Sequence, residues 1–445
     1  MARVAASAGI LLALLLAAGC GGRGATGPNV NLSRAFGNDG EVAAAVDPSN
    51  HDVLVAGSIG DGGSFMRVYS SLDGGGRWRS GSVAAAPQAS VCVSDPAVGI
   101  GPGGTQYYAF LRVSACGDPD ETSTLLIRSR SGPRGAWGPA RTIPPAEPRP
   151  QNEQDRPVLA VDNGRRSPSR GRIWVAFVEL RPQALDDELW LTHSDDRGRH
   201  WSHPALLGTW LYEPSLAVMP DGSLIVSSWN VSDKDISVMR VARDGTTNSV
   251  GFDAGVRPRG FWHCRNHKRR GKLRAMPHRC VGAAPAVAID SAHRSIYVAW
   301  SGPARNGSRD VFVWKLDGRL RYAGGPFGTP PPLVRDGPVP ADQFLATDAV
   351  DQRTGAVWVC FYDTHGDPSN RFARFTCEVS TDRGQSWHEL QVARTPSDEA
   401  AAGADPFAYG DYESVVAAGG SAHAFWTDGR LLQEEIFTAT LRRPH

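Results

Sequence analysis

One pattern recurs through nearly the whole chain and limits the folds open to it. A short apolar segment rich in small residues is followed by a turn with Asp or Gly, and then by a second segment rich in valine and aromatic residues. The first segments are 42–46, 96–100, 157–161, 214–218, 285–289, 344–347 and 413–416, and the second are 53–56, 107–111, 173–178, 224–229, 296–300, 357–362 and 422–426. Because one sheet cannot cover both of its own faces, a repeat of about 58 residues predicts sheets stacked around an axis.

Seven units of this kind predict an all-β propeller of four-stranded blades, and six blades with an irregular segment at 90–137 are the alternative. The last unit has three evident strands, the third at 435–441, and residues 29–36 are expected to supply its fourth strand and close the ring. Glycine and proline account for 50 and 32 of the 445 residues, an excess that indicates many tight turns between short strands. A mainly helical fold is excluded.

The first twenty residues indicate export from the cytoplasm. Arg3 precedes the apolar run Ile10–Leu16, which is too short for a membrane span, and three small residues, Ala17-Ala18-Gly19, stand before Cys20. This segment resembles the lipobox of bacterial lipoproteins, in which the cysteine is acylated, although leucine is commoner at the position of Ala17. An ordinary secretory signal cleaved nearby is the alternative. The resemblance implies a signal peptide at 1–19, lipidation at Cys20, a short tether at 20–29 and a propeller at 30–445, held at the cell envelope by lipid.

Export places the six remaining cysteines in an oxidising compartment, where disulfides are the favoured interpretation. Six cysteines allow about 15 pairings, of which local pairing is the most economical. We therefore predict three bridges, Cys92–Cys116, Cys264–Cys280 and Cys360–Cys377. The last pair is expected on two consecutive strands, 357–362 and 372–379.

The most specific motif is Ser-x-Asp-x-Gly-x-x-Trp, which occurs three times at the same place within its unit. The three copies are Ser71, Asp73, Gly75 and Trp78; Ser194, Asp196, Gly198 and Trp201; and Ser380, Asp382, Gly384 and Trp387. These segments are identified as Asp boxes (BNR repeats), and through them the chain resembles the sialidase-like β-propellers. In that family the boxes lie on the face away from the active site, so they indicate the fold and not the reaction.

The motif also has a mechanical explanation. Its Asp is expected to accept backbone N–H bonds across a hairpin turn, its Gly permits a positive φ, and its Trp wedges between neighbouring sheets. Asp73, Asp196 and Asp382 are therefore predicted to be structural and not catalytic.

Acidic residues recur just before the first strands, where the loops of a propeller open on one face around its channel. A ring of carboxylates is suited to binding a cation, recognising sugar hydroxyls, or general acid and base chemistry with raised pKa values. Capping of strands and loops is an equally weighted alternative. The series is Asp39, Glu41, Asp95, Asp155, Glu213, Asp342, Asp411 and Glu413, and only the fifth unit, with Ala283-Ala284-Pro285, breaks it. The residues predicted to bind a ligand are Asp95, Arg156, Glu213, Asp342, Asp411, Asp428 and Arg430.

The same face holds residues that are candidates for catalysing glycoside hydrolysis. Tyr412 beside Glu413 is similar to the sialidase nucleophile, a phenol activated by a carboxylate, and Asp155 is the third candidate catalytic residue. Adjacency counts against the pair, because the family brings its Glu from a separate strand and neighbouring residues of a strand point to opposite faces. The family's Arg-Ile-Pro motif, which supplies the first of three substrate-binding arginines, is absent, and Arg156-Pro157 is its nearest echo.

An insertion at 257–280 holds seven arginines, two lysines and no acid, together with His263, His267 and His278. Its position predicts a basic flap over the acidic ring, suited to an anionic polymer, lipid headgroups or an acidic partner. A solvated loop closed by a disulfide is the alternative. The His and Cys spacings fit no standard zinc pattern, so no metal is predicted there.

Together these patterns predict a surface lipoprotein that recognises glycan or protein ligands at the channel face without catalysis. An exo-sialidase-type glycoside hydrolase acting on extracellular glycans is the alternative. The 47 basic and 46 acidic residues leave a charge of +1, which argues against nucleic acid as a partner. We expect a monomer that needs no cofactor, a structural cation at the acidic mouth being the one alternative.

Overall fold

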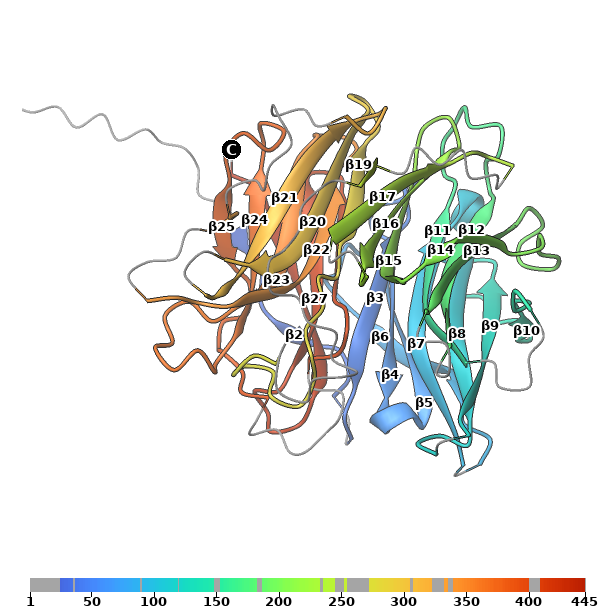
Figure 1. The fold of residues 1–445 in the computed structure, drawn as a ribbon, viewed down its shortest axis with the longest axis horizontal. Coiled ribbons are helices and arrows are strands. Elements are labelled where there is room, and N and C mark those ends of the chain that lie inside the picture. The colour runs from blue at the N-terminus through green and yellow to red at the C-terminus, as the bar shows by residue number, and fades with distance from the viewer. Residues whose placement is uncertain are drawn as a thin grey trace, which may run out of the picture.

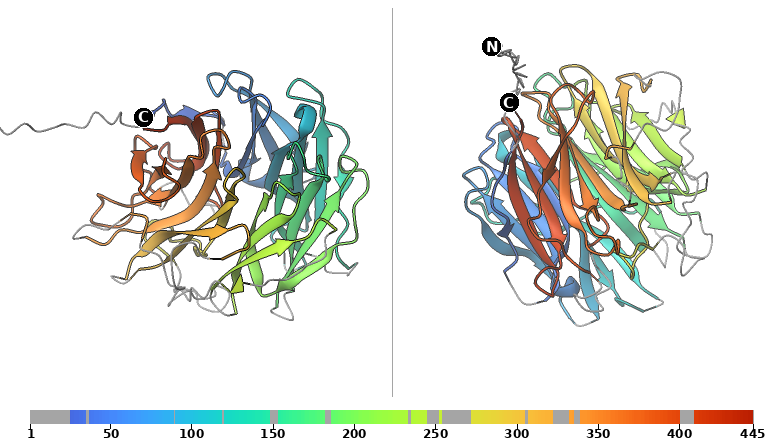
Figure 2. Two further views of the ribbon diagram at one scale, coloured as in Figure 1. Left: turned by 90° about the horizontal axis from the view of Figure 1, so that it is seen from above. Right: turned by 90° about the vertical axis from the view of Figure 1, so that its left-hand side faces the viewer.

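The computed structural model describes residues 25–444 apart from 35–36, 89, 119, 148–152, 182–185, 233–234, 245–251, 254–271, 305–306, 322–331, 335–338 and 400–408. Within these residues the chain forms seven antiparallel sheets arranged around a central axis (Figure 1, Figure 2). The predicted all-β propeller is therefore confirmed, with seven blades and not six.

The strands follow the predicted repeat closely, and each blade is numbered here in chain order. Blade 1 holds β3 (Gly40–Val46), β4 (Leu54–Gly60), β5 (Phe65–Ser71) and β6 (Arg79–Ala85); blade 2 holds β7 (Val91–Ile100), β8 (Gln106–Ser114), β9 (Thr122–Arg130) and β10 (Arg141–Thr142). Blade 3 holds β11 (Glu153–Val161), β12 (Ile173–Leu180), β13 (Glu188–Ser194) and β14 (Ala205–Thr209); blade 4 holds β15 (Leu211–Val218), β16 (Leu224–Asn230), β17 (Asp235–Val241) and β18 (Phe252–Asp253). Blade 5 holds β19 (Ala286–Asp290), β20 (Ser295–Pro303) and β21 (Arg309–Asp317); blade 6 holds β22 (Gln343–Val350), β23 (Val357–Asp363), β24 (Arg374–Ser380) and β25 (His388–Gln391). Blade 7 holds β26 (Ser414–Ala418), β27 (Ser421–Asp428) and β28 (Glu435–Arg442), and two short 3₁₀ turns, η1 (Asp61–Gly63) and η2 (Pro102–Gly104), lie in blades 1 and 2.

The first strand of each blade lies innermost, and each inner strand contacts the inner strand of the next blade until β26 meets β3. The ring is closed from the N-terminal side, because β1 (Ala25–Thr26) and β2 (Val30–Asn31) both pair with β28. This is the closure expected of residues 29–36, with β1 added before it. It covers the outer edge of blade 7, which would otherwise expose unpaired backbone groups.

The core lies in the seams between blades. Second-strand tryptophans such as Trp174, Trp300, Trp358 and Trp426 are fully buried there. Between blades 1 and 7, Trp78 meets Phe425 edge to face, with ring centroids 5.6 Å apart. Each seam is thus filled by large apolar side chains contributed from both sheets.

The inner strands run between two opposite faces of the ring. We call the face where they begin the mouth face; it carries Glu41 and Asp95, and η1 marks it at the lower end of Figure 1. We call the other face the turn face. It carries the turns between first and second strands and between third and fourth strands, such as 162–172 and 195–201 of blade 3.

Three turns on the turn face, those after β5, β13 and β24, share one set of hydrogen bonds. In the third of them the carboxylate of Asp382 accepts hydrogen bonds from the hydroxyl of Ser380 and the backbone N–H groups of Gln385 and Ser386. The hydroxyl of Ser380 in turn accepts from the N–H of Gly384, whose φ is 84°. This geometry explains why the spacing requires Ser, Asp and Gly at these positions.

Two predicted disulfides are present, Cys92–Cys116 and Cys360–Cys377. Cys360 and Cys377 stand directly opposite each other on β23 and β24. The third predicted pair includes Cys264, which lies outside the described residues. In the described part of the chain, no helix has the length and apolar character needed to cross a membrane.

Replacing Asp382 by Ala is expected to lower the free energy of unfolding by about 1–2 kcal/mol, because the donors of its turn lose their acceptor. Partial burial acts to raise the pKa of Asp382. Hydrogen bonds from Ser386 and Ser380 outweigh this effect and hold the pKa below its ordinary value. The stabilisation is therefore present at neutral pH and lost as acid protonates the carboxylate, so wild type and variant should converge at low pH.

Chemical denaturation at neutral and acid pH measures this difference. Asp120→Ala serves as the control, because Asp120 is an exposed turn residue. An Asp382→Ala protein as stable as the control at neutral pH would refute the structural role.

Candidate functional site

The inner strands share an unusual backbone feature where they start at the mouth face. Six non-glycine residues at equivalent positions have φ between 41° and 56°, namely Glu41, Asp95, Arg156, Glu213, Ala284 and Leu345. In five of these blades the pairing register between first and second strand shifts across the same residue, as a β-bulge does. Holding a residue that has a Cβ in the left-handed backbone region costs about 1–2 kcal/mol of conformational free energy. Backbone strain of this kind is characteristic of functional sites.

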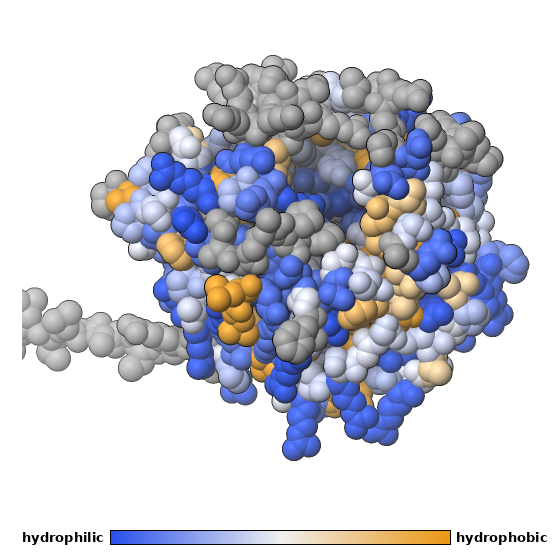
Figure 3. Space-filling model, turned by 90° about the horizontal axis from the view of Figure 1, so that it is seen from below, coloured by the Kyte–Doolittle hydropathy of each residue, from blue (hydrophilic) through white to orange (hydrophobic). Residues whose placement is uncertain are grey.

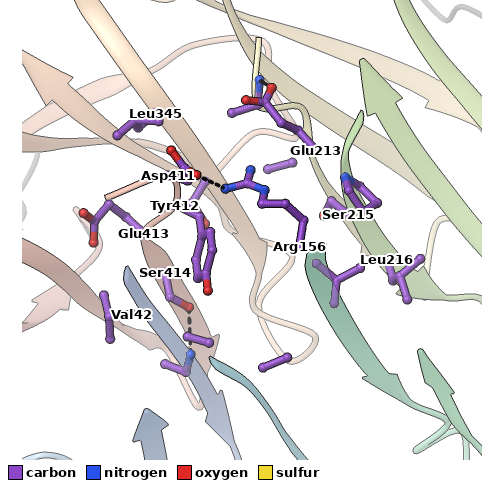
Figure 4. Close-up of a pocket in the computed structure, with 18 of the residues that line it drawn as sticks. Val42, Arg156, Glu213, Ser215, Leu216, Leu345, Asp411, Tyr412, Glu413 and Ser414 are labelled. Carbon is purple, nitrogen blue, oxygen red and sulfur yellow. Dashed lines mark hydrogen bonds and ion pairs between the residues drawn. The ribbon is translucent and has the colours of Figure 1, made fainter. Parts of the chain in front are cut away.

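Four of the six left-handed residues are charged, and the bulges bring their side chains together at the mouth. The cavity there has a volume of about 270 Å³ and is lined by Arg156, Glu213, Asp411, Tyr412 and Leu345, among others (Figure 4). Further down the channel, small and apolar residues such as Ala44 and Val98 line it. Figure 3 shows the hydrophilic hollow from the mouth side.

Arg156 lies at the centre of this site and is 6% exposed. Its Nη1 atom is 3.6 Å from Oδ2 of Asp411, and its guanidinium carbon is 5.0 Å from the ring centroid of Tyr412. Burial acts to lower the pKa of Arg156, but Asp411 and Glu213 outweigh it and raise the pKa above its ordinary value. The guanidinium is therefore a fixed cation within a group of acids.

A second arginine, Arg279, joins the site from the basic insertion. Its guanidinium is 2.7 Å from Asp411 and 3.3 Å from Oε1 of Glu41, and its side chain is 24% exposed. Arg279 also borders an adjoining cavity of about 430 Å³ with Tyr212, Glu213 and Asp411. The C-terminal end of the insertion thus lies over the mouth, whereas residues 257–271, including His263 and His267, lie outside the described residues.

The carboxyl groups around these arginines hold their protons unusually tightly. Burial, followed by the charge of Asp411, raises the pKa of Glu41 to about 7. Burial and the neighbouring Glu41 raise the pKa of Asp95 well above its ordinary value. Burial also raises the pKa of Asp155 and of Glu213, against the opposing effects of Tyr212 and Arg156 at Asp155 and of Arg156 at Glu213. Near neutral pH Glu41 is therefore divided between its carboxylic acid and carboxylate forms.

Two tyrosine–carboxylate hydrogen bonds lie in or beside the site. The phenol of Tyr212 donates to Asp155, and the phenol of Tyr362 donates to Oε1 of Glu413 at 2.5 Å. The other Glu413 oxygen accepts from the backbone N–H of Thr427. Tyr412 points instead toward Arg156 and the carbonyl of Pro96. The adjacent residues Tyr412 and Glu413 are therefore not paired with each other.

The structure brings Asp95, Asp155, Arg156, Glu213, Asp411 and Tyr412 of the predicted site residues around the mouth. Asp342 accepts from the backbone N–H of Arg309 and from Asn370 nearby. Asp428 pairs with Arg430 and accepts from the indole of Trp426 at the side of blade 7.

Two residues of the mouth, Tyr212 and Arg279, were not predicted from the sequence. Tyr212 stands directly before Glu213 as Tyr412 stands before Glu413, so the repeated Tyr-Glu pair was the available signal. Nothing in the sequence distinguished Arg279 from the other cations of the insertion. Within the described ranges, no group of three or more His, Cys, Asp or Glu side chains is placed to hold a metal ion.

Comparisons with known proteins identify the fold and leave the chemistry open. No protein-family model and no curated sequence matches the chain. A Dyadobacter fermentans protein of unknown function aligns over 95% of this chain and 100% of its own, with 12% identity and a TM-score of 0.51. Trypanosoma rangeli sialidase aligns over 75% of this chain with 14% identity and a TM-score of 0.48, and this chain spans 54% of its length. Penicillium chrysogenum α-L-arabinanase aligns over 94% of this chain and 98% of its own, with 10% identity and a TM-score of 0.49.

Identities this low concern the fold alone. The protein is a seven-bladed β-propeller. Similarity of fold does not transfer a substrate, so function must be argued from the mouth itself.

Glu41→Gln is expected to change how stability depends on pH. The unfolded chain releases this proton near pH 4.5 and the folded protein near pH 7, so wild type should lose stability relative to the variant as pH rises between these values. The expected difference is on the order of 3 kcal/mol, measured by denaturation at several pH values. The control is Glu121→Gln, because Glu121 does not line the cavity. Parallel pH profiles for wild type and Glu41→Gln would contradict the raised pKa.

Proposed function

We propose that the protein is an exported, lipid-anchored propeller with Asp-box (BNR) repeats that binds a glycan at its mouth without hydrolysing it. One observation carries the proposal: five blades contribute Glu41, Asp95, Asp155, Glu213 and Asp411 to one electrostatically coupled cluster around buried Arg156. Arg156, Glu213 and Asp411 of this cluster line the small cavity at the mouth. Fixed carboxyl and guanidinium groups form bidentate hydrogen bonds with neighbouring hydroxyls, the groups that a sugar presents.

The shape of the cavity also supports a sugar. A volume of about 270 Å³ is suited to one small ring rather than to a drug-sized ligand or the surface of a folded partner. The ring of Tyr412 lines the cavity and provides an apolar face on which a sugar ring can stack.

Charge limits the class of sugar. Five acids surround Arg156 and Arg279, and Asp411 pairs with both of these arginines. The charge of a third arginine, Arg309, acts on Glu213 and Asp342 at the edge of the cluster. A carboxylate-bearing sugar such as sialic acid would compete with these acids for the same guanidinium groups. Neutral or amino sugars would meet hydrogen-bond acceptors instead, so these are the ligands we propose.

The state of the tyrosines argues against a phenolate nucleophile. Burial, followed by Asp95 and Glu41, raises the pKa of Tyr412 well above its ordinary value, and burial followed by Asp155 does the same for Tyr212. Attack by a preformed phenolate requires the opposite shift, and the other route, transfer of the phenol proton to a neighbouring base during attack, is one that the Tyr212–Asp155 hydrogen bond would have to supply. Both phenols are better suited to donating hydrogen bonds.

A second candidate function has one specific observation in its favour. With a pKa of about 7, Glu41 is suited to act as a general acid near neutral pH, and Asp95 and Asp155 provide neighbouring carboxyl groups. Glycoside hydrolysis is therefore the alternative that the functional experiment must separate from binding.

The experiment is a binding and turnover screen of neutral, amino and anionic glycans with the protein from residue 21 onward. Tyr412→Leu should weaken binding of the best ligand about tenfold, because the stacking surface is lost. Arg371→Ala, on an exposed arginine paired with Asp398 outside the cavity, is the control. No product should accumulate. Turnover that disappears in Glu41→Gln would replace the proposal with a hydrolase, and unchanged affinity in Tyr412→Leu would exclude the mouth as the site.

The proposed anchor has a separate test. Cys20→Ser should shift the protein from the membrane fraction to the soluble fraction when cells are fractionated in high salt, because the acyl chain is lost. Wild-type protein prepared in the same salt is the control. Retention of the variant in the membrane would argue against lipidation at Cys20.

A further inference from the structure

The turn face is strongly basic, although the chain as a whole carries a charge of only +1. In blade 3, the turn before β12 exposes Arg165, Arg166 and Arg170, and the turn after β13 exposes Arg197 and Arg199. These two turns lie together, because Arg172 of the first forms an ion pair with Asp195 of the second at 2.7 Å. None of the five exposed arginines forms an ion pair with another described residue.

Arginines are exposed on this face all around the ring. The other six blades contribute Arg77, Arg134, Arg243, Arg319, Arg383 and Arg442, each of them exposed. The aspartates of the same turns keep their charge, and some of them, such as Asp52, Asp195 and Asp221, are exposed. The exposed arginines nevertheless outnumber the exposed aspartates on this face.

One part of this face is also hollowed. At the seam between blades 4 and 5 a cavity of about 270 Å³ is lined by Arg240, His293, Arg294, Arg319 and Arg321, together with Asp221 and Asp317. Arg240 pairs with Asp221 and Arg321 with Asp317, whereas Arg294 and Arg319 form no ion pair with a described residue. The cavity thus offers two unpaired guanidinium groups to an anionic group of the size of a phosphate.

The first described strand also lies at this face. Ala25 of β1 pairs with Arg442 at the end of β28, and Arg442 pairs with Ser421 in the turn of blade 7. That turn contacts blade 6 on the same face, where Arg353 donates to the carbonyl of Gly419. The C-terminus is accordingly at the upper end of Figure 1, opposite η1. Twenty-four residues precede Ala25, and the predicted lipid attachment site, Cys20, is within about 18 Å of it along the chain.

We propose that the turn face docks onto a membrane surface that presents anionic phospholipid headgroups, and that the mouth face consequently points away from the membrane. Each arginine close to such a surface adds a small electrostatic attraction, so many weak contacts add up to a defined orientation. A lipid surface is favoured over a single anionic molecule because the arginines surround the whole ring, which only an extended plane can contact at once. This inference concerns a different face from the proposed glycan site and does not depend on it.

Vesicle sedimentation tests the proposal with the protein from residue 21 onward, which retains every strand of the propeller and lacks the acylated cysteine. The protein should bind vesicles that contain phosphatidylglycerol, and should not bind vesicles of phosphatidylcholine alone. Binding should be lost in about 1 M salt, where charges are screened beyond about 3 Å.

Replacing Arg165, Arg166 and Arg170 together by Gln should weaken binding to the anionic vesicles at least tenfold. The matched control replaces Arg34, Arg112 and Arg394 by Gln; these arginines are exposed toward the mouth end and their removal changes the net charge equally. Unchanged melting temperatures verify that both triple variants are folded.

Three results would overturn the proposal. They are equal binding to neutral vesicles, an equal loss of binding in the control variant, and binding of inorganic phosphate or double-stranded DNA without binding to anionic vesicles. The glycan experiment can fail while the vesicle result stands, and the reverse also holds, because the two faces are tested by different variants.

Discussion

The site depends on a backbone distortion at the start of the inner strands. In an undistorted strand, alternate side chains would point into the two neighbouring seams, where the large apolar residues of the blades pack. A left-handed residue at Glu41, Asp95, Arg156 and Glu213 interrupts that alternation, and Arg156 and Glu213 line the cavity at the axis. Each distortion costs stability, and the paired and packed strands that follow it on both sides compensate. The charged cluster is therefore a consequence of strain that the ring as a whole stabilises.

The ring also separates two charged faces. Most inner strands begin near acids at the mouth and end near arginines at the turns, so these blades contribute to both faces at once. Blade 3 illustrates this, since β11 has Asp155 and Arg156 near its start and leads into the turn with Arg165, Arg166 and Arg170. Closure by β1 and β2 places the N-terminal end of the described chain on the basic face. The two proposals, glycan binding at the mouth and lipid contact at the turns, thus concern opposite ends of the same strands.

Most of the fold could be predicted from the sequence, because it follows from local patterns. Small residues in first strands, the three Ser-x-Asp-x-Gly-x-x-Trp turns and local cysteine pairs each act within one blade or one seam. The site could be predicted only in part. The acids before the inner strands were recognisable, but the direction of each side chain depends on bulges that residue types do not specify. Glu413, in a blade whose first two strands show no register shift, also departs from the pattern: it follows Tyr412 directly and yet turns outward to Tyr362. Arg279 reaches the mouth through the tertiary placement of a loop, and the basic turn face is concealed by the balanced net charge.

The central claim is that the mouth is a sugar-binding cavity organised around Arg156. A crystal structure of the protein from residue 21 onward, soaked with small neutral and amino sugars, tests it most directly. The account predicts sugar density against the ring of Tyr412, with its hydroxyls hydrogen-bonded to Asp411, Glu213 or Arg156. Sugar bound only elsewhere on the molecule, or a mouth that stays free of sugar at saturating concentration, would contradict the account.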